Sequence, residues 1–330
     1  MERLEHFLRS NRWVWAAIGV VLLWLALALV TGRWSLSSLS GIILSASFLA
    51  VVGLGQMVVV TTGRGNIDLS VAAVMTLSAY LALLVIGGED HMVGLGLVVT
   101  LALGVGIGLV NAFLVIAIRI PAIIATLATG YILATATLLA NRSLDGFAVS
   151  PFLKTIASGR FFGVPIMALL AVGAVVCLGL VLRHTVFGQQ LSAVGQNRAA
   201  ARLAGVPVNR VIAVAFVVSS TLAAFTGLLL GAYIGGAFLE MGQPYLLQSI
   251  AAVVVGGTLI FGGSATAFGT LFASILLVLV VTVMQIMGLP RGTQDMVQGV
   301  VVILVLAVAA GRSVAGRRRR LPAREAEAEA

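Results

Sequence analysis

Long uncharged, apolar runs are the feature that most constrains the fold of this chain. A helix needs about 20 apolar residues to cross the hydrocarbon core of a bilayer. One run, 241–290, is too long for a single span, and its glycine-rich middle, GGTLIFGGSATAFGT (256–270), predicts a turn between two helices. We therefore expect an all-α integral membrane protein, a polytopic bundle of about ten transmembrane helices. The uncharged runs are 13–30, 34–63, 69–88, 92–118, 120–141, 161–182, 211–239, 241–290 and 296–311.

The composition excludes a water-soluble globule. Of the 330 residues, 60% are hydrophobic and only 9% are charged, whereas soluble domains carry roughly 25% charged residues. The 38 glycines suit close packing of helices within a membrane. The net charge of +9 does not indicate nucleic-acid binding, because the basic residues lie at the ends of the apolar runs, where membrane topology places them.

Ten spans would place both termini on one side of the membrane, and the charge distribution assigns that side to the cytoplasm. In this orientation 15 basic residues lie inside and 5 outside, in agreement with the positive-inside rule. The first run starts like a signal peptide but is long for one, so we expect an uncleaved span. The predicted parts are a cytoplasmic N-terminus (1–12), a transmembrane domain (13–311) and a basic, then acidic, cytoplasmic tail (312–330).

The residues that an enzyme would need are missing from the predicted spans. There are no paired carboxylates and no G-x-x-x-x-G-K-[ST] phosphate loop, and the three histidines are scattered, so we expect no catalytic residues, no metal site and no bound cofactor. If ATP drives transport, the ATPase must be another chain. Every acid except Asp68 falls in a predicted tail or outer loop, which argues against an ion-coupled carrier with carboxylates at mid-membrane.

The largest predicted cytoplasmic loop, 183–210, contains a short helix with both ends marked. Asn197 is a plausible N-cap, RAAARLA is a strong helix former, Gly205 is a plausible C′ residue, and Pro207 prevents the helix from continuing. We interpret this helix as a docking element for a cytoplasmic partner. An interfacial helix that rests on lipid is the alternative.

The stretch TTGRGNIDLSVAA (61–73) carries two charges between two apolar runs, and it predicts a break between two spans on the inner side. Its glycines permit the turn. Asp68 precedes a helix-forming apolar run and suits a helix N-terminus, where free N–H groups and the dipole stabilise a carboxylate. Arg64 lies on the side where positive charge belongs and is a candidate ion-pair partner for Asp68.

Three stretches occur in order along the chain: GNIDLSVAAVMTLSAY (65–80), TVFGQQLSAVGQNRAAARLAGVPVNR (185–210) and SIAAVVVGGTLIFGGSATAFGT (249–270). Together they resemble the permease subunits of ribose-type ABC importers, in the superfamily that also contains branched-chain amino-acid permeases. The resemblance runs from about residue 40 to 311. The chain departs from the family pattern at some positions, none of which removes a reactive group; these are Asn66, Ala72, Gln189, Ser264 and Ala265.

The resemblance implies an assembly in the bacterial inner membrane. Two permease subunits, identical or related, would form the pathway within the lipid, and a periplasmic or lipid-anchored binding protein would deliver a monosaccharide, a ribose-like pentose or a hexose. A cytoplasmic ATP-binding subunit would use the ATP, and the 183–210 loop would be the segment that couples it to the permease. A permease for an amino acid or another small metabolite, or a stand-alone secondary carrier, is the alternative.

The resemblance also singles out residues in each stretch. In the coupling loop they are Gly188, Gly195, Asn197, Arg198, Ala200, Arg202, Gly205 and Pro207. At the inner mouth they are Gly63, Gly65, Asp68 and Ser70. In the third stretch a glycine hinge would comprise Gly256, Gly257, Gly262, Gly263 and Gly269.

Neutral polar side chains are scattered through the predicted spans, and they suit a polyhydroxylated, uncharged solute better than a zwitterion. Each of them taken alone has a simpler interpretation as a hydrogen bond between helices. The candidates for the pathway are Gln56, Thr62, Asn111 and Thr126.

Overall fold

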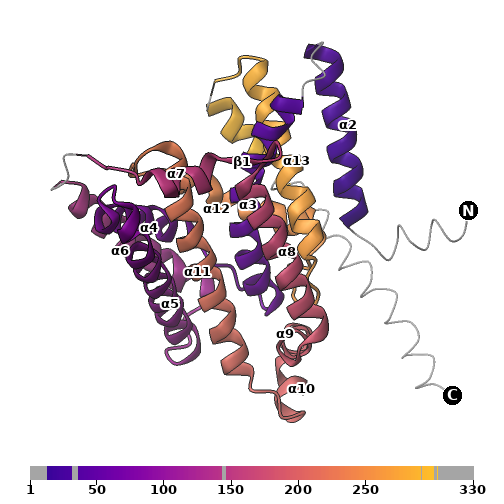
Figure 1. Cartoon of the computed structure of the whole chain (residues 1–330). Coiled ribbons are helices and arrows are strands. Elements are labelled where there is room, and N and C mark those ends of the chain that lie inside the picture. The colour runs from indigo at the N-terminus through magenta and orange to yellow at the C-terminus, as the bar shows by residue number, and fades with distance from the viewer. Residues whose placement is uncertain (1–12, 32–35, 143–145, 291, 301–302, 304–330) are drawn as a thin grey trace, which may run out of the picture.

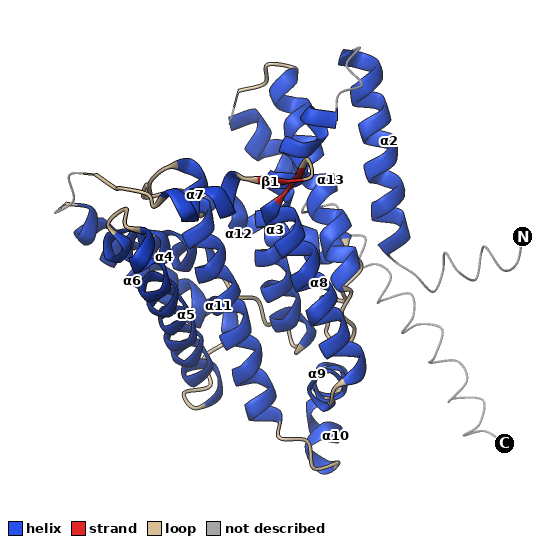
Figure 2. Ribbon diagram, in the orientation of Figure 1, coloured by secondary structure: helices blue, strands red, loops and turns tan. Residues whose placement is uncertain are grey.

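The computed structural model describes residues 13–31, 36–142, 146–290, 292–300 and 303. Over these residues the chain is almost entirely helical, and its short hairpin pairs β1 antiparallel with β2 (Figure 2). The predicted tails, 1–12 and 312–330, lie outside the described residues. The elements are α2 (Trp13–Thr31), α3 (Leu36–Thr61), α4 (Val71–Ile86), η1 (Asp90–Met92), α5 (Val93–Ile116), α6 (Ala122–Asn141), α7 (Pro151–Ser158), β1 (Arg160–Phe161), β2 (Val164–Pro165), α8 (Ile166–His184), α9 (Val186–Gln196), α10 (Arg198–Leu203), α11 (Val208–Ile234), α12 (Gln243–Val255) and α13 (Ala267–Ile286). Residues 292–300 are also helical.

Six of the described helices are long and apolar enough to cross a membrane: α3, α5 together with η1, α6, α8, α11 and α13. Three shorter apolar helices accompany them, within α2, α4 and α12. The prediction of an all-α protein with several membrane-spanning helices is therefore confirmed. The last predicted span, 296–311, falls mostly outside the described residues.

Two helices are shorter than the spans that the sequence predicts for them. At 1.5 Å per residue, the 16 residues of α4 and the 13 residues of α12 reach only about 24 and 20 Å, less than the roughly 30 Å of a hydrocarbon core. Irregular backbone completes the path in both cases, at 62–70 before α4 and at 256–266 after α12. Both runs are uncharged, so hydropathy alone does not give the ends of these helices.

The turn predicted within 256–270 is confirmed, but it ends at Thr266, and Gly269 lies in the first turn of α13. Gly269 therefore lies outside the turn in which the sequence places it, and its role in a hinge stays a prediction. A Cβ atom at Gly269 would come within 1.8 Å of the Gly256 carbonyl oxygen. This glycine permits close contact between the end of α12 and the start of α13.

Helices α3 and α11 form the centre of the bundle (Figure 1). Helix α11 packs along α5, α4 and α3, and α13 packs along α3 and α2. Outside this core, α5, α6 and α8 present large apolar side chains at the surface, including Phe113, Ile132 and Leu180. An apolar surface of this extent is stable only against lipid or another protein chain.

The two ends of the bundle differ. Helix α8 leads into α9 and α10, which lie together at one end, where α3 ends and α11 begins (Figure 1). Helices α4 and α11 run away from this end toward the hairpin and α7. We call it the α9–α10 end and use its position to locate the sites described below.

Candidate functional site

Three segments far apart in the sequence meet at the α9–α10 end. They are the end of α3 (Thr61–Gly63), the segment that joins α9 to α10 (Ser192–Arg198) and the glycine turn (Gly262–Gly263), and we call this meeting point the junction. The Gly263 N–H donates to the Thr61 carbonyl at 3.0 Å. The Ser192 hydroxyl donates to the Gly263 carbonyl at 2.7 Å. Arg198 Nη2 donates to the carbonyls of Thr62 and Gly63, both at 3.2 Å.

Glycine is required at the junction because the three backbones are in contact. A Cβ atom at Gly195 would come within 2.0 Å of the Thr61 carbonyl oxygen and 2.2 Å of the Gly263 nitrogen. A Cβ atom at Gly262 would come within 2.4 Å of the Gly63 Cα atom. Gly195 and Gly262 belong to the second and third stretches that carry the family resemblance, and Gly63 lies two residues before the first, so glycines from three distant parts of the chain permit contact at one place.

The short helix α10 has the caps that the sequence predicts. Asn197 Oδ1 accepts from the N–H groups of Ala199 and Ala200 at 3.0 and 3.2 Å. At the other end Gly205 has a φ of +79°, and the Val206 N–H donates to the Ala201 carbonyl at 3.0 Å. This left-handed cap satisfies carbonyls that the helix leaves free. Helix α11 then starts immediately after Pro207.

Helix α10 presents an apolar side chain to the outside of the bundle. Leu203 is 91% exposed, and its neighbour Arg202 is also exposed. The sequence predicts this helix and its caps but not the exposure of Leu203, because capping residues show where a helix begins and ends and not which face it buries. Nothing local in the sequence indicates Ser192, whose partner Gly263 lies 71 residues away.

Beyond the junction the chain passes through the buried segment 62–70, which holds Asp68 away from solvent. Asp68 is 0% exposed. Its Oδ1 accepts from the Ser70 N–H at 3.0 Å and from the Ser70 hydroxyl at 2.6 Å, and its Oδ2 accepts from the Ser219 hydroxyl of α11 at 2.9 Å. Asn111 of α5 donates to the same Ser70 hydroxyl at 2.9 Å. The carboxylate therefore joins the start of α4 to α11, and through Ser70 to α5.

The structure corrects two expectations about this segment. Asp68 does lie at the start of α4 and accepts a backbone N–H there, as predicted, but it is buried and not at an exposed inner mouth. The predicted ion pair with Arg64 is wrong, because Arg64 is exposed and the ion pair found within the described residues is His91–Glu89. Hydroxyl groups take the place of a cation around the carboxylate.

The four polar residues proposed for the pathway surround segment 62–70. The Gln56 amide, with its nitrogen toward the Asp68 carbonyl, donates to it at 3.2 Å and accepts from the Asp68 N–H at 3.3 Å. The Thr126 hydroxyl accepts from the Leu69 N–H at 2.9 Å, and the Thr62 hydroxyl accepts from Asn66 at 2.9 Å. Irregular backbone is stable at membrane depth only where other groups satisfy its polar atoms. In this conformation Gln56 and Thr126 supply such bonds to the backbone of the segment. Thr62 and Asn111 bond instead to its polar side chains, those of Asn66 and Ser70.

A basic cleft of about 560 Å³ lies beside the junction. Arg64, Arg119, Arg198 and Arg202 line it. Burial and the nearby charges of Arg64 and Arg202 lower the pKa of the Arg198 guanidinium to about 10, so it remains charged near neutral pH. The α9–α10 end therefore carries a concentrated positive charge, as expected for a cytoplasmic face.

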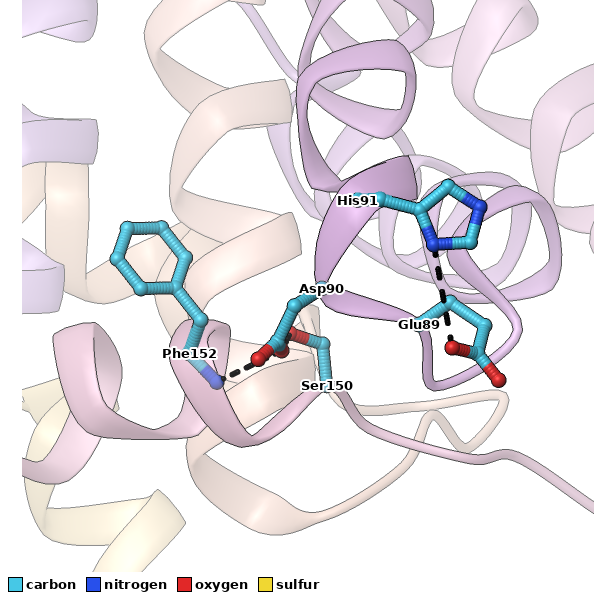
Figure 3. A network of polar contacts seen from close by, with 5 residues as sticks. All are labelled: Glu89, Asp90, His91, Ser150 and Phe152. Carbon is cyan, nitrogen blue, oxygen red and sulfur yellow. Dashed lines mark hydrogen bonds and ion pairs between the residues drawn. The ribbon is translucent and has the colours of Figure 1, made fainter.

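A second polar network, drawn in Figure 3, lies at the start of α7, which Figure 1 places away from α9 and α10. Asp90 accepts from the Ser150 hydroxyl at 2.5 Å and from the Phe152 N–H at 3.0 Å, which fixes the start of α7 against the turn that precedes α5. Glu89 and His91 approach within 3.9 Å on the surface. This network holds a loop in place, and no metal-binding group of His, Cys, Asp and Glu is found within the described residues.

Comparison with known proteins decides the family. The family model described as "Branched-chain amino acid transport system / permease component" matches residues 38–306. The chain belongs to this family. The permease is thus a multi-pass protein of the bacterial inner membrane and a component of an ABC importer.

Named relatives cover most of the permease. It is 33% identical over 304 residues, 91% of its own length and 87% of the relative's, to the autoinducer 2 import system permease protein LsrC of Klebsiella pneumoniae. It is 32% identical over 266 residues, 79% of its length and 77% of the relative's, to the probable ABC transporter permease protein y4mJ of Sinorhizobium fredii. No solved structure matches the chain significantly.

Proposed function

We propose that the permease imports a sugar-like solute as one of two permease subunits in an ATP-driven importer, with a separate cytoplasmic ATPase and a solute-binding protein on the outer side. The observation that carries the proposal is the junction, where the capped helix α10, the end of α3 and the glycine turn are hydrogen-bonded together. The relatives named as autoinducer 2 import system permeases support import of a small solute of that kind.

The proposed topology has about ten spans with both termini in the cytoplasm. The ratio of 15 inside to 5 outside basic residues supports this orientation. The α9–α10 end is then cytoplasmic, so that the exposed Leu203 and the basic cleft face the ATPase.

The proposed mechanism is a switch between conformations. Closure of the ATPase around ATP pushes α10, and Arg198 transmits the movement to the carbonyls of Thr62 and Gly63. Segment 62–70 then shifts α4 against α11, because Asp68 and Ser219 join them. The ATPase can change the populations of the outward- and inward-open states only if it binds them with different affinities.

The proposal is tested by reconstituting the permease in proteoliposomes with the ATPase and binding protein encoded beside it. We expect uptake of radiolabelled ribose or autoinducer 2 that requires ATP and both partner proteins. Uptake of leucine in place of either sugar-like solute would assign the permease to amino acids. Uptake by the permease alone, without the ATPase, would identify a secondary carrier.

A further inference from the structure

A cavity lined with amide side chains lies at the start of α12, away from the residues of the junction. Its volume of about 790 Å³ is within the roughly 300–1,000 Å³ that small-molecule sites occupy. It lies between the outer ends of α4 and α6 on one side and α12, α13 and residues 294–298 on the other. The amides that line it are Asn141, Gln243, Gln248, Gln285, Gln294 and Gln298.

The concentration of amides is specific to this cavity. The chain has nine glutamines, and five of them line it. A carboxamide offers both donors and an acceptor, so it can bond a hydroxyl group in either direction. Among the described lining residues, the charged ones are the acids Glu240 and Asp295, and none is Lys, Arg or His. A solute carboxylate would therefore find no described positive side chain.

Some of the amides are already oriented by bonds to neighbours. Gln248 Nε2 donates to Gln298 Oε1 at 2.9 Å, and the Tyr80 hydroxyl donates to Asn141 Oδ1 at 2.8 Å. These bonds leave the Asn141 and Gln298 nitrogens with donor capacity for a solute. The side chains of Gln243 and Gln285 are exposed and form no hydrogen bond within the described residues.

The cavity wall is connected to the junction through α4. Tyr80 lies near the outer end of this helix, and Asp68 and Ser70 lie at its start. On the same helix, the Thr76 hydroxyl accepts from the Gly242 N–H at 3.3 Å, and a Cβ atom at Gly242 would come within 2.1 Å of the Ala72 carbonyl oxygen. Helix α4 is therefore in backbone contact with the start of α12, so a shift of α4 moves both walls of the cavity.

We propose that this cavity is the outer solute site of the permease and that it binds an uncharged, polyhydroxylated solute through its amides. The inference rests on the proposed function and adds the residues that select the solute. The walls beside the amides include the apolar side chains of Leu247 and Val281. Amides bond the hydroxyl groups of the solute, and these apolar side chains contact its C–H faces.

The test uses the double variant Gln243→Leu, Gln285→Leu. Both amides lack a partner in the described structure, so their removal leaves the described bonds of the fold intact. Thr282→Val is the matched control, because it removes a polar group from the same helix as Gln285 outside the cavity lining. Binding of ribose to the purified permease–ATPase complex is measured by saturation-transfer NMR. Leucine at the same concentration represents the alternative solute class, amino acids.

We expect ribose to bind the wild type and the Thr282→Val variant, and to bind the double variant about tenfold more weakly, as expected for the loss of roughly two neutral hydrogen bonds. Equal ribose binding by wild type and double variant would overturn the inference, as would saturation by leucine alone. Uptake into proteoliposomes separates the two proposals. Equal rates of ribose import by wild-type and double-variant vesicles would show that the amide site is wrong, while the proposed function would stand. If wild-type vesicles import no sugar-like solute, both proposals are contradicted.

Discussion

Asp68 is a buried carboxylate whose hydrogen-bond partners are neutral. It accepts two hydroxyl groups and one N–H, from Ser70 and from Ser219. A buried acceptor of this kind matters mainly through the donors that its removal leaves unpaired. The structure therefore favours a positioning role, in which Asp68 holds the start of α4 against α11.

Substitution of Asp68 separates a structural role from a role of its charge. We expect Asp68→Asn to keep folding and transport, because the amide oxygen still accepts from Ser70 and the amide nitrogen can donate to Ser219. We expect Asp68→Ala to lose both, because each buried donor left unpaired costs about 1–3 kcal/mol. Thermal unfolding in detergent and solute uptake are the measurements. If both variants fold and neither transports, the carboxylate charge acts in the transport cycle.

The position of Asp68 could be predicted from the sequence, but its burial could not. A carboxylate just before an apolar helix-forming run suits a helix N-terminus, and that part is local. Its partner Ser219 lies 151 residues away, and nothing near residue 68 indicates it. A charge between two apolar runs therefore suggested an exposed position at the membrane surface, where no distant partner is needed.

Arg198 offers a prediction for pH. The pKa of Arg198, about 10, keeps the wild-type side chain charged through neutral pH. In Arg198→Lys the same burial and the same neighbours, Arg64 and Arg202, would lower the pKa of the lysine ammonium below its ordinary value of about 10.4. We expect uptake by this variant to fall as the pH rises from neutral into the alkaline range, because the neutral amine that forms there loses its charge-assisted bonds to Thr62 and Gly63. The ratio of variant to wild-type uptake between pH 6.5 and 9 is the measurement, and a constant ratio would contradict the prediction.

At the scale of elements, the junction depends on contacts between backbones. Helices α3 and α9 and the glycine turn approach closely because Gly195, Gly262 and Gly63 have no side chain. Backbone atoms cannot move aside as the tip of a flexible side chain can. A single methyl group is therefore enough to separate the elements.

We expect Gly195→Ala to reduce uptake about tenfold, since overpacking costs roughly 1–3 kcal/mol. The bundle should stay folded, because the added methyl group disturbs a single contact at one end of the fold. Gly173→Ala is the matched control, because Gly173 is also helical and a Cβ atom there meets nothing within 4 Å. The control should be neutral or slightly more stable. Uptake and ATPase activity of the reconstituted complex are measured together, and normal uptake by Gly195→Ala would show that the contact is not used in coupling.

The elements themselves were predictable to different degrees. The caps of α10 depend on residues within one short segment, so Asn197 and Gly205 could be identified from the sequence. The junction joins segments separated by more than sixty residues, and the sequence showed only that each contains glycine. Gly269 was placed in the turn for the same reason, although it lies in α13 against Gly256.

At the scale of the whole molecule, hydropathy finds the apolar helices but not how far each one crosses. The runs at 69–88 and 241–290 predicted full spans, whereas α4 and α12 are shorter than the hydrocarbon core is thick. Irregular segments complete both paths on the α9–α10 side, and the one before α4 lines the basic cleft through Arg64, Gly65 and Asn66. Each of these two short helices therefore leaves irregular backbone on its junction side.

The orientation of the molecule is tested by labelling its two ends. Leu203 of α10 is 91% exposed at one end, and Phe162 of the hairpin is 93% exposed at the other. Because 15 of 20 basic residues lie on the side assigned to the cytoplasm, we expect a membrane-impermeant maleimide to label Phe162→Cys but not Leu203→Cys in spheroplasts, and the reverse in inverted vesicles. Both variants carry Cys177→Ser, since Cys177 is the chain's single cysteine and is itself exposed. The opposite labelling pattern would place α10 outside the cell, where no ATPase could reach it.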